Sequence, residues 1–278
     1  MPEQNRSSTV APPGQPEGWL QRGSLWQLLP PTTSTLGLIE FIGGSYLAAT
    51  PQLSYRRLLE ALSQRGWRVH AWSYVPGFDH QSQATEAWKT FRRIRDDDGL
   101  IPTGRRQQPA SNGLPLLRLG HSLGCKLHLL APDAGRLSQG LVALAFNNFS
   151  AERSVPFLAE VGQQLGFRSE FSPSPAETLR LVSRTWRQPR NLLVRFRRDE
   201  LDQSPRLLEA LRQRPDDASE LLELPGDHLT PASAGLRRNL LGDWADDPSR
   251  QRQIERLADQ ISTWVIGEFG GAPAPYSS

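Results

Sequence analysis

The stretch Gly120-His121-Ser122-Leu123-Gly124 decides the fold that this sequence predicts. It directly follows an apolar run, residues 114–119, and precedes a helix-competent segment, residues 125–131. A serine that joins a strand to a helix through so tight a turn needs small residues on both sides, because larger side chains would collide with the neighbouring strand and helix. The turn leaves the serine hydroxyl above the sheet and over the helix N-terminus, where negative charge is stabilised. In this context the pentapeptide predicts a nucleophile elbow.

Length, composition and charge bound the class of protein. A chain of 278 residues with 37% hydrophobic residues can bury a large core, and α/β folds often use this length as one domain. Its one cysteine, Cys125, excludes an internal disulfide framework. The formal net charge is only +3, and the short arginine clusters lack the one-signed surface of a nucleic-acid interface. We therefore expect no nucleic-acid partner.

The two ends of the chain differ in composition from its middle. Residues 1–17 are polar and proline-rich and fit neither a secretory signal nor a transit peptide, so we expect a disordered tail. A flexible C-terminal tail is expected at residues 271–278. No apolar stretch approaches the roughly 20 residues that a membrane-spanning helix needs. These observations predict a cytoplasmic protein without an integral membrane segment.

Between the tails, apolar runs of strand length alternate with amphipathic segments of helix length. Residues 19–29 could supply one or two opening strands, and further runs fit buried strands at residues 36–42, 67–74, 114–119, 141–146, 191–196 and 220–224. Helical spacing of apolar residues is found in segments 53–65, 84–94 and 251–269. This alternation is typical of a mostly parallel sheet with helices on both faces. We predict a single α/β domain over residues 18–270.

One interval, residues 147–190, is longer than a crossover between two strands requires. Helix-like stretches fall at residues 157–165 and 176–186, and a loop of this length usually has a function or a structure of its own. It is either a crossover helix with surface decoration or a helical cap at about residues 148–188, and we favour the cap. The side chains that we expect in the substrate pocket are Tyr46, Phe157, Leu158 and Phe171.

A serine nucleophile needs a base, and the base needs a group that orients it. His228 is the one histidine downstream of the elbow helix, and it lies in the loop after the last apolar run, where the base of a Ser–acid–His order belongs. The acid should follow the preceding run. Asp199 comes three residues after that run, Asp202 lies one turn further, and Asp227 is adjacent to His228. We assign Asp199, with Asp202 as the alternative acid and Asp227 third; neutralisation of nearby arginines is the competing interpretation.

The negative charge that develops on an attacked carbonyl needs backbone N–H donors. We expect one from Leu123, directly after the serine, and the other from Gly44 in the Gly43-Gly44 pair, because paired glycines let the backbone approach a substrate closely. A plain tight turn is the alternative for this pair. Cys125 fits a packed core position better than a reactive thiol. No spaced set of ligands predicts a metal, and we expect no cofactor.

These motifs, in this order, resemble the α/β-hydrolase superfamily. More narrowly, the chain is similar to an uncharacterised domain-of-unknown-function family of cyanobacteria and plant plastids. The similarity covers residues 19–264 and is carried by residues 41–44, 48–55, 78–80, 120–124, 146–148, 153–157 and 226–231. It implies an α/β-hydrolase fold and implies no substrate, because the fold by itself does not establish an activity.

Two functions stay open at this point. In the first, the protein is a serine hydrolase for an ester or thioester: Ser122 attacks the acyl carbon, His228 takes its proton and Asp199 orients the imidazole. Its partner is then a small acyl compound, lipid-like ones included. In the second, the same fold serves as a binding or assembly protein with an idle triad. The intact set of serine, histidine and glycines favours the hydrolase, and acyl transfer or lyase chemistry is a lesser third option.

Overall fold

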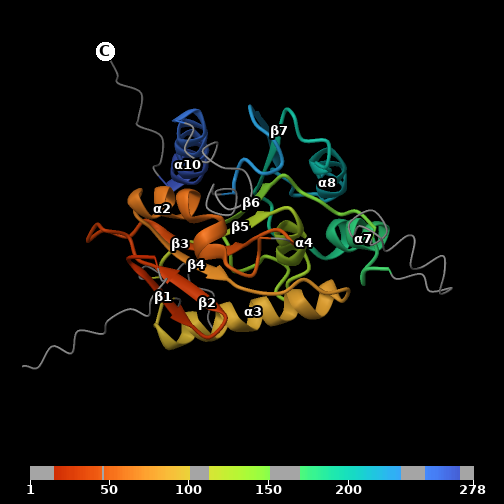
Figure 1. The fold of residues 1–278 in the computed structure, drawn as a ribbon. Coiled ribbons are helices and arrows are strands. Elements are labelled where there is room, and N and C mark those ends of the chain that lie inside the picture. Colours follow the sequence, from red (N-terminus) through yellow and green to blue (C-terminus); the bar gives the residue numbers. More distant parts are fainter. Residues whose placement is uncertain (1–15, 46, 101–112, 151–169, 233–247, 270–278) are drawn as a thin grey trace, which may run out of the picture.

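The apolar runs of the sequence form the strands of an eight-stranded sheet (Figure 1). The computed structural model describes residues 16–45, 47–100, 113–150, 170–232 and 248–269. The strand order is β1-β2-β4-β3-β5-β6-β7-β8; the β1–β2 and β2–β4 pairs are antiparallel and the others are parallel. The strands are β1 (Trp19–Arg22), β2 (Leu25–Leu28), β3 (Gly37–Ile42), β4 (Trp67–Trp72), β5 (Leu116–His121), β6 (Gly140–Leu144), β7 (Asn191–Phe196) and β8 (Glu220–Leu224).

Helices cover both faces of the sheet (Figure 1). Alternate residues of a strand point to opposite faces, and in β6 Val142 and Leu144 join one core cluster while Leu141 and Ala143 join another. The first cluster lies under α2 (Arg56–Gln64) and α10 (Pro248–Phe269). The opposite face carries α3 (His80–Asp97), α4 (Leu123–Leu129), α7 (Pro175–Thr185) and α8 (Ser204–Leu211). A short helix, α1 (Pro51–Ser54), precedes α2.

The register of the parallel strands brings several loops to one edge of the sheet. Ile42, the last residue of β3, pairs with Gly120 of β5, so the loop after β3 begins beside the elbow. Phe196 of β7 pairs with Leu224 of β8, so the loops after these two strands also start at the same level. Ligands of open α/β sheets bind at the carboxyl ends of the strands. The functional site is therefore expected at this edge.

The predicted strands and most of the predicted helices are confirmed. Every apolar run that we assigned to a strand lies on one, and segments 53–65, 84–94 and 251–269 fall on α1–α2, α3 and α10. The helix α8 was not predicted. The helix expected at residues 176–186 is α7, which packs against α8 and the sheet and thus forms the crossover from β6 to β7.

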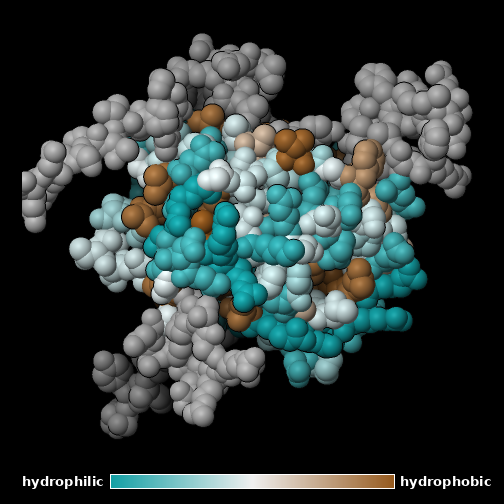
Figure 2. Space-filling model, turned by 90° about the horizontal axis from the view of Figure 1, so that it is seen from below, coloured by the Kyte–Doolittle hydropathy of each residue, from teal (hydrophilic) through white to brown (hydrophobic). Residues whose placement is uncertain are grey.

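Several predictions concern residues outside the described ranges. These are the helix at 157–165 and most of the two predicted tails, so the cap over the site stays a prediction. Seen from the side of α3, the surface is mainly hydrophilic, with apolar residues in small separate groups (Figure 2). Within the described ranges, no helix is both long enough and apolar enough to cross a membrane.

Candidate active site

Ser122 stands on a strained turn between β5 and α4. Its backbone has φ 54° and ψ −119°, a conformation that costs a non-glycine residue about 1–3 kcal/mol. The Ser122 N–H donates to the Leu144 carbonyl at 2.9 Å, which holds the turn. A Cβ on Gly120 would lie 2.6 Å from the backbone nitrogen of Cys125, and one on Gly124 would lie 2.0 Å from the Ile42 carbonyl oxygen. The elbow therefore requires glycine at both positions.

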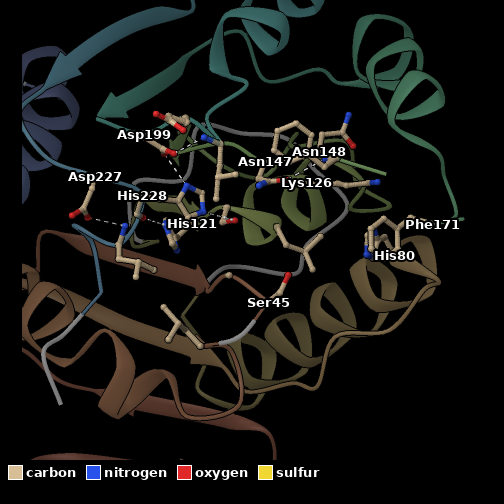
Figure 3. A pocket seen from close by; sticks show the side chains of 18 of the residues that line it. Ser45, His80, His121, Lys126, Asn147, Asn148, Phe171, Asp199, Asp227 and His228 are labelled. Carbon is tan, nitrogen blue, oxygen red and sulfur yellow. Dashed lines mark hydrogen bonds and ion pairs between the residues drawn. The ribbon is translucent and has the colours of Figure 1, made fainter. Parts of the chain in front are cut away.

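Ser122, His228 and Asp199, from three different loops, form a hydrogen-bonded chain, of which Figure 3 labels Asp199 and His228. His228, in the loop after β8, has its Nε2 atom 3.0 Å from Ser122 Oγ. Its Nδ1 atom lies 2.8 Å from Oδ2 of Asp199, in the loop after β7. The second oxygen of Asp199 accepts from the Leu201 N–H at 2.9 Å, and the carboxylate is completely buried. An Nδ1–H that donates to this carboxylate leaves Nε2 free to accept the serine proton.

The other two candidate acids are held elsewhere. Asp202 accepts from the N–H and the hydroxyl of Ser204 at 2.8 and 3.1 Å, at the start of α8. Burial raises the pKa of the Asp202 carboxyl, against the hydrogen bonds from Ser204. Asp227 accepts from the Leu229 N–H at 3.0 Å, within its own loop. The structure thus places Asp199, and neither of the alternatives, against the His228 ring.

A buried chain of hydrogen bonds connects the elbow with the loops on either side of it. The Gly44 N–H donates to the Tyr55 hydroxyl at 2.8 Å, so the hydroxyl proton is directed to His121 Nδ1, also at 2.8 Å. The Nε2–H of His121 then donates to the His228 carbonyl at 2.8 Å. Burial lowers the pKa of His121 to about 3, so the ring is neutral, as this direction of donation requires. These hydrogen bonds hold the loop after β3 and the loop after β8 in place on either side of Ser122.

This contact changes the expectation for Gly44. Its N–H was predicted to face the substrate, but in the structure it donates to Tyr55, because the Tyr55 ring lies under the loop. Gly44 still lies against the nucleophile, since a Cβ there would be 3.0 Å from Ser122 Cβ. The next residue, Ser45, lines the same cavity as Ser122. Its backbone N–H becomes the candidate for the second donor, beside that of Leu123.

A cavity of about 520 Å³ lies over the elbow. Asp199 and His228, with Ser122 hydrogen-bonded to His228, line one end of it. The predicted Phe171 lines the other end together with His80 and Lys126, two residues that we did not predict to be functional (Figure 3). The lining also includes the apolar side chains of Leu47, Phe149, Leu201 and Leu229, and Asn147 and Asn148 lie between the two ends (Figure 3). Of the predicted pocket residues, Phe171 lines the cavity, whereas Tyr46, Phe157 and Leu158 lie outside the described residues.

Some of these residues left a signal in the sequence. Lys126 follows the nucleophile by four positions, which on a helix places both on one face. Tyr55 and His80 lie in stretches 48–55 and 78–80, which carry the family resemblance. In the described part of the chain, no group of three or more His, Cys, Asp or Glu side chains is arranged to bind a metal. The expectation of metal-free and cofactor-free chemistry stays a prediction.

Solved structures of the same architecture include esterases and a lipase. Carboxyl esterase 2 from the mycorrhizal fungus Tuber melanosporum is 17% identical, with a TM-score of 0.56 over 86% of this chain and 81% of that chain. The monoacylglycerol lipase of Paleococcus ferrophilus is 16% identical, with a TM-score of 0.51 over 87% of this chain and 98% of that chain. An alpha/beta hydrolase enzyme from the sediment metagenome of the lagoon of Mar Chica is 13% identical, with a TM-score of 0.51 over 91% of this chain and 99% of that chain. At these identities the likeness shows the fold, which is that of the α/β hydrolases.

Sequence comparison gives a narrower relationship. No curated protein matches the chain in sequence. The model of one protein family, described as "Protein of unknown function (DUF1350)", matches residues 18–262, which include the elbow and the loops of Asp199 and His228. This agrees with the resemblance to an uncharacterised family noted in the sequence. The chain belongs to the DUF1350 family.

Proposed function

We propose that the protein is a serine hydrolase that cleaves an ester or thioester. The observation that carries this proposal is the chain of contacts from Ser122 Oγ through His228 to Asp199 at the mouth of a cavity. A serine hydroxyl becomes nucleophilic when a positioned base takes its proton and a third group orients that base. The esterase and lipase names of the structural neighbours support the same reaction class.

The reaction would proceed in two steps, acylation of Ser122 and hydrolysis of the acyl-enzyme. Ser122 Oγ attacks the acyl carbon while its proton passes to His228 Nε2, and Asp199 stabilises the imidazolium that forms. The Leu123 and Ser45 N–H groups would hold the oxyanion. The C–O or C–S bond to the leaving group then breaks, and the alcohol or thiol departs with the proton from His228. Water, activated by the same imidazole, cleaves the acyl-enzyme and restores the serine.

The mechanism predicts that the native protein reacts with a fluorophosphonate probe and hydrolyses p-nitrophenyl butyrate. Ser122→Ala should abolish probe labelling, and His228→Ala should lower kcat/KM by about 10²–10⁴-fold, which is the usual contribution of a positioned base. Ser82→Ala, on the exposed surface of α3, is the matched control and should label like the native chain. Circular dichroism checks that each variant is folded.

The competing function is a binding protein with an idle triad on the same scaffold. The two are separated by the same measurement. A folded native protein that neither reacts with the probe nor hydrolyses the ester would reject the hydrolase and leave the binding function.

A further inference from the structure

Lys126 is a buried cation in the wall of the cavity that contains Ser122. It lies on α4 four residues after the nucleophile, about 6 Å further along the helix axis, and it is completely buried. The chain has two lysines, and the other, Lys89, is exposed on α3. Lysine is almost never fully buried unless its charge is paired. The position of Lys126 therefore requires a reason.

The described residues satisfy only part of this ammonium group. Of its three N–H donors, one goes to the Pro173 carbonyl at 2.9 Å, and the ring of Phe171 lies 5.8 Å from Nζ. No carboxylate of the described residues is within ion-pair distance of Nζ; Glu170 and Glu177 act on it only from further away, and burial lowers its pKa to about 8. Two of its N–H donors thus have no partner among the described residues, and most of the positive charge remains at neutral pH.

A second unsatisfied group lies beside it. His80, at the start of α3, is buried and packs on the Phe171 ring with centroids 4.3 Å apart. Neither of its ring nitrogens makes a hydrogen bond of normal geometry to the described residues, and the Gly77 backbone lies near enough to raise its pKa. Burial and the charge of Lys126 outweigh that effect and lower the pKa of His80 to about 3. The ring is therefore neutral, and its one N–H can donate a hydrogen bond to a ligand.

We propose that this end of the cavity binds an anionic group of the substrate, a carboxylate or a phosphate-like group, through Lys126 Nζ and the His80 N–H. The substrate is then an acyl ester or thioester that carries a negative charge a few atoms from the scissile carbonyl. This inference rests on the proposed hydrolase, since it names the substrate class of the same site. It explains why a cation is buried where an apolar side chain would suffice for packing.

The test is a pair of p-nitrophenyl esters of equal length, the hemiadipate with a terminal carboxylate and the uncharged heptanoate. A third ester, of 5-phosphonopentanoate, distinguishes a phosphate-like group from a carboxylate. The native protein should prefer an anionic ester in kcat/KM. Lys126→Met should reduce the ratio of anionic to neutral kcat/KM by about 10- to 100-fold, the range for hydrogen bonds to charged groups. Lys89→Met should leave this ratio as in the native chain, and Lys126→Gln replaces Lys126→Met if the latter does not fold.

Calorimetry separates failure of this inference from failure of the hydrolase. Monomethyl adipate is titrated into the folded Ser122→Ala protein and into the Ser122→Ala, Lys126→Met double variant. Binding that depends on Lys126 without hydrolysis of any ester would support the anion site and reject the hydrolase. Hydrolysis with the same anionic-to-neutral ratio in the native chain and in Lys126→Met would overturn the anion site and leave the hydrolase. Neither hydrolysis nor binding that depends on Lys126 would reject both.

Discussion

At the scale of single residues, the site depends on which oxygen each donor reaches. Asp199 and Asp202 follow the same strand and are three residues apart, but only Asp199 contacts the His228 ring. The oxygens of Asp202 are used by Ser204 at the beginning of α8. The two carboxylates therefore make separate contacts, one with an imidazole and the other with the start of a helix.

Replacement of the two carboxylates by amides tests this difference. Asp199→Asn should lower kcat for an activated ester by about 10⁴-fold, because an amide that faces Nδ1 favours the wrong imidazole tautomer. Asp202→Asn should change kcat by less than tenfold and leave the stability nearly unchanged, because the asparagine Oδ1 can still accept from the Ser204 N–H at the start of α8. Steady-state kinetics and urea unfolding measure both. A larger loss of kcat in Asp202→Asn would transfer the role of the acid to that residue.

At the scale of elements, the turn between β5 and α4 packs closely against the end of β3. The end of β3 lies so near α4 that Gly124 has no room for a side chain, since an added Cβ would lie 2.0 Å from the Ile42 carbonyl oxygen. Gly267 offers the contrast. It lies on the exposed side of α10, and a Cβ there would meet nothing within 4 Å.

The same substitution at the two glycines should have opposite effects. Gly124→Ala should destabilise the protein by several kcal/mol or prevent folding, because the clash is with backbone and not with a flexible side chain. Gly267→Ala should stabilise it by up to about 1 kcal/mol, the difference in helix propensity between the two residues. Thermal unfolding of both variants is the measurement. Equal stabilities of the two would contradict the close approach at the elbow.

At the scale of the whole molecule, most of the histidines are buried in the neutral form. The core closes over four of the five in the chain and lowers each pKa to about 3; these are His70, His80, His121 and His128. Burial is the largest cause for all four, because an imidazolium loses its hydration in the interior. The folded state therefore binds fewer protons than the unfolded chain at mildly acidic pH.

This difference in proton binding predicts acid sensitivity. The contribution of the neutral histidines is fully present above the unfolded pKa of about 6.5 and is lost as the pH falls from there towards about 3, by up to about 1.4 kcal/mol per pH unit for each residue. The raised pKa values of Glu40 and Asp202 act in the opposite direction, but these are two groups against four. We expect the urea concentration at the unfolding midpoint to decrease when the pH is lowered from 6.5 to 5.

The matched variant is His70→Gln, which removes one of the four groups and should make the dependence on pH shallower. A urea midpoint that stays constant between pH 6.5 and pH 5 would contradict the neutral burial of the histidines.

Much of the architecture was predictable from the sequence because it depends on local patterns. Buried strands need short apolar runs, and the elbow needs two glycines around Ser122, so both are visible without coordinates. The order of serine, aspartate and histidine along the chain likewise follows from where strands end, and this order predicts His228 as the base. Helix α8 was not predicted, although its segment, Ser204–Leu211, is amphipathic.

The choice of partners within the site was decided by the tertiary structure. From the sequence, Asp199, Asp202 and Asp227 all remained possible acids, and Gly44 was expected to serve the substrate. In the fold the Gly44 N–H donates to Tyr55, and the charge of Lys126 has no carboxylate partner among the described residues. The physical reason is that a hydrogen bond or an ion pair depends on a few tenths of an ångström between residues distant in the chain. Local patterns determine which elements form, and only their packing determines which atoms meet.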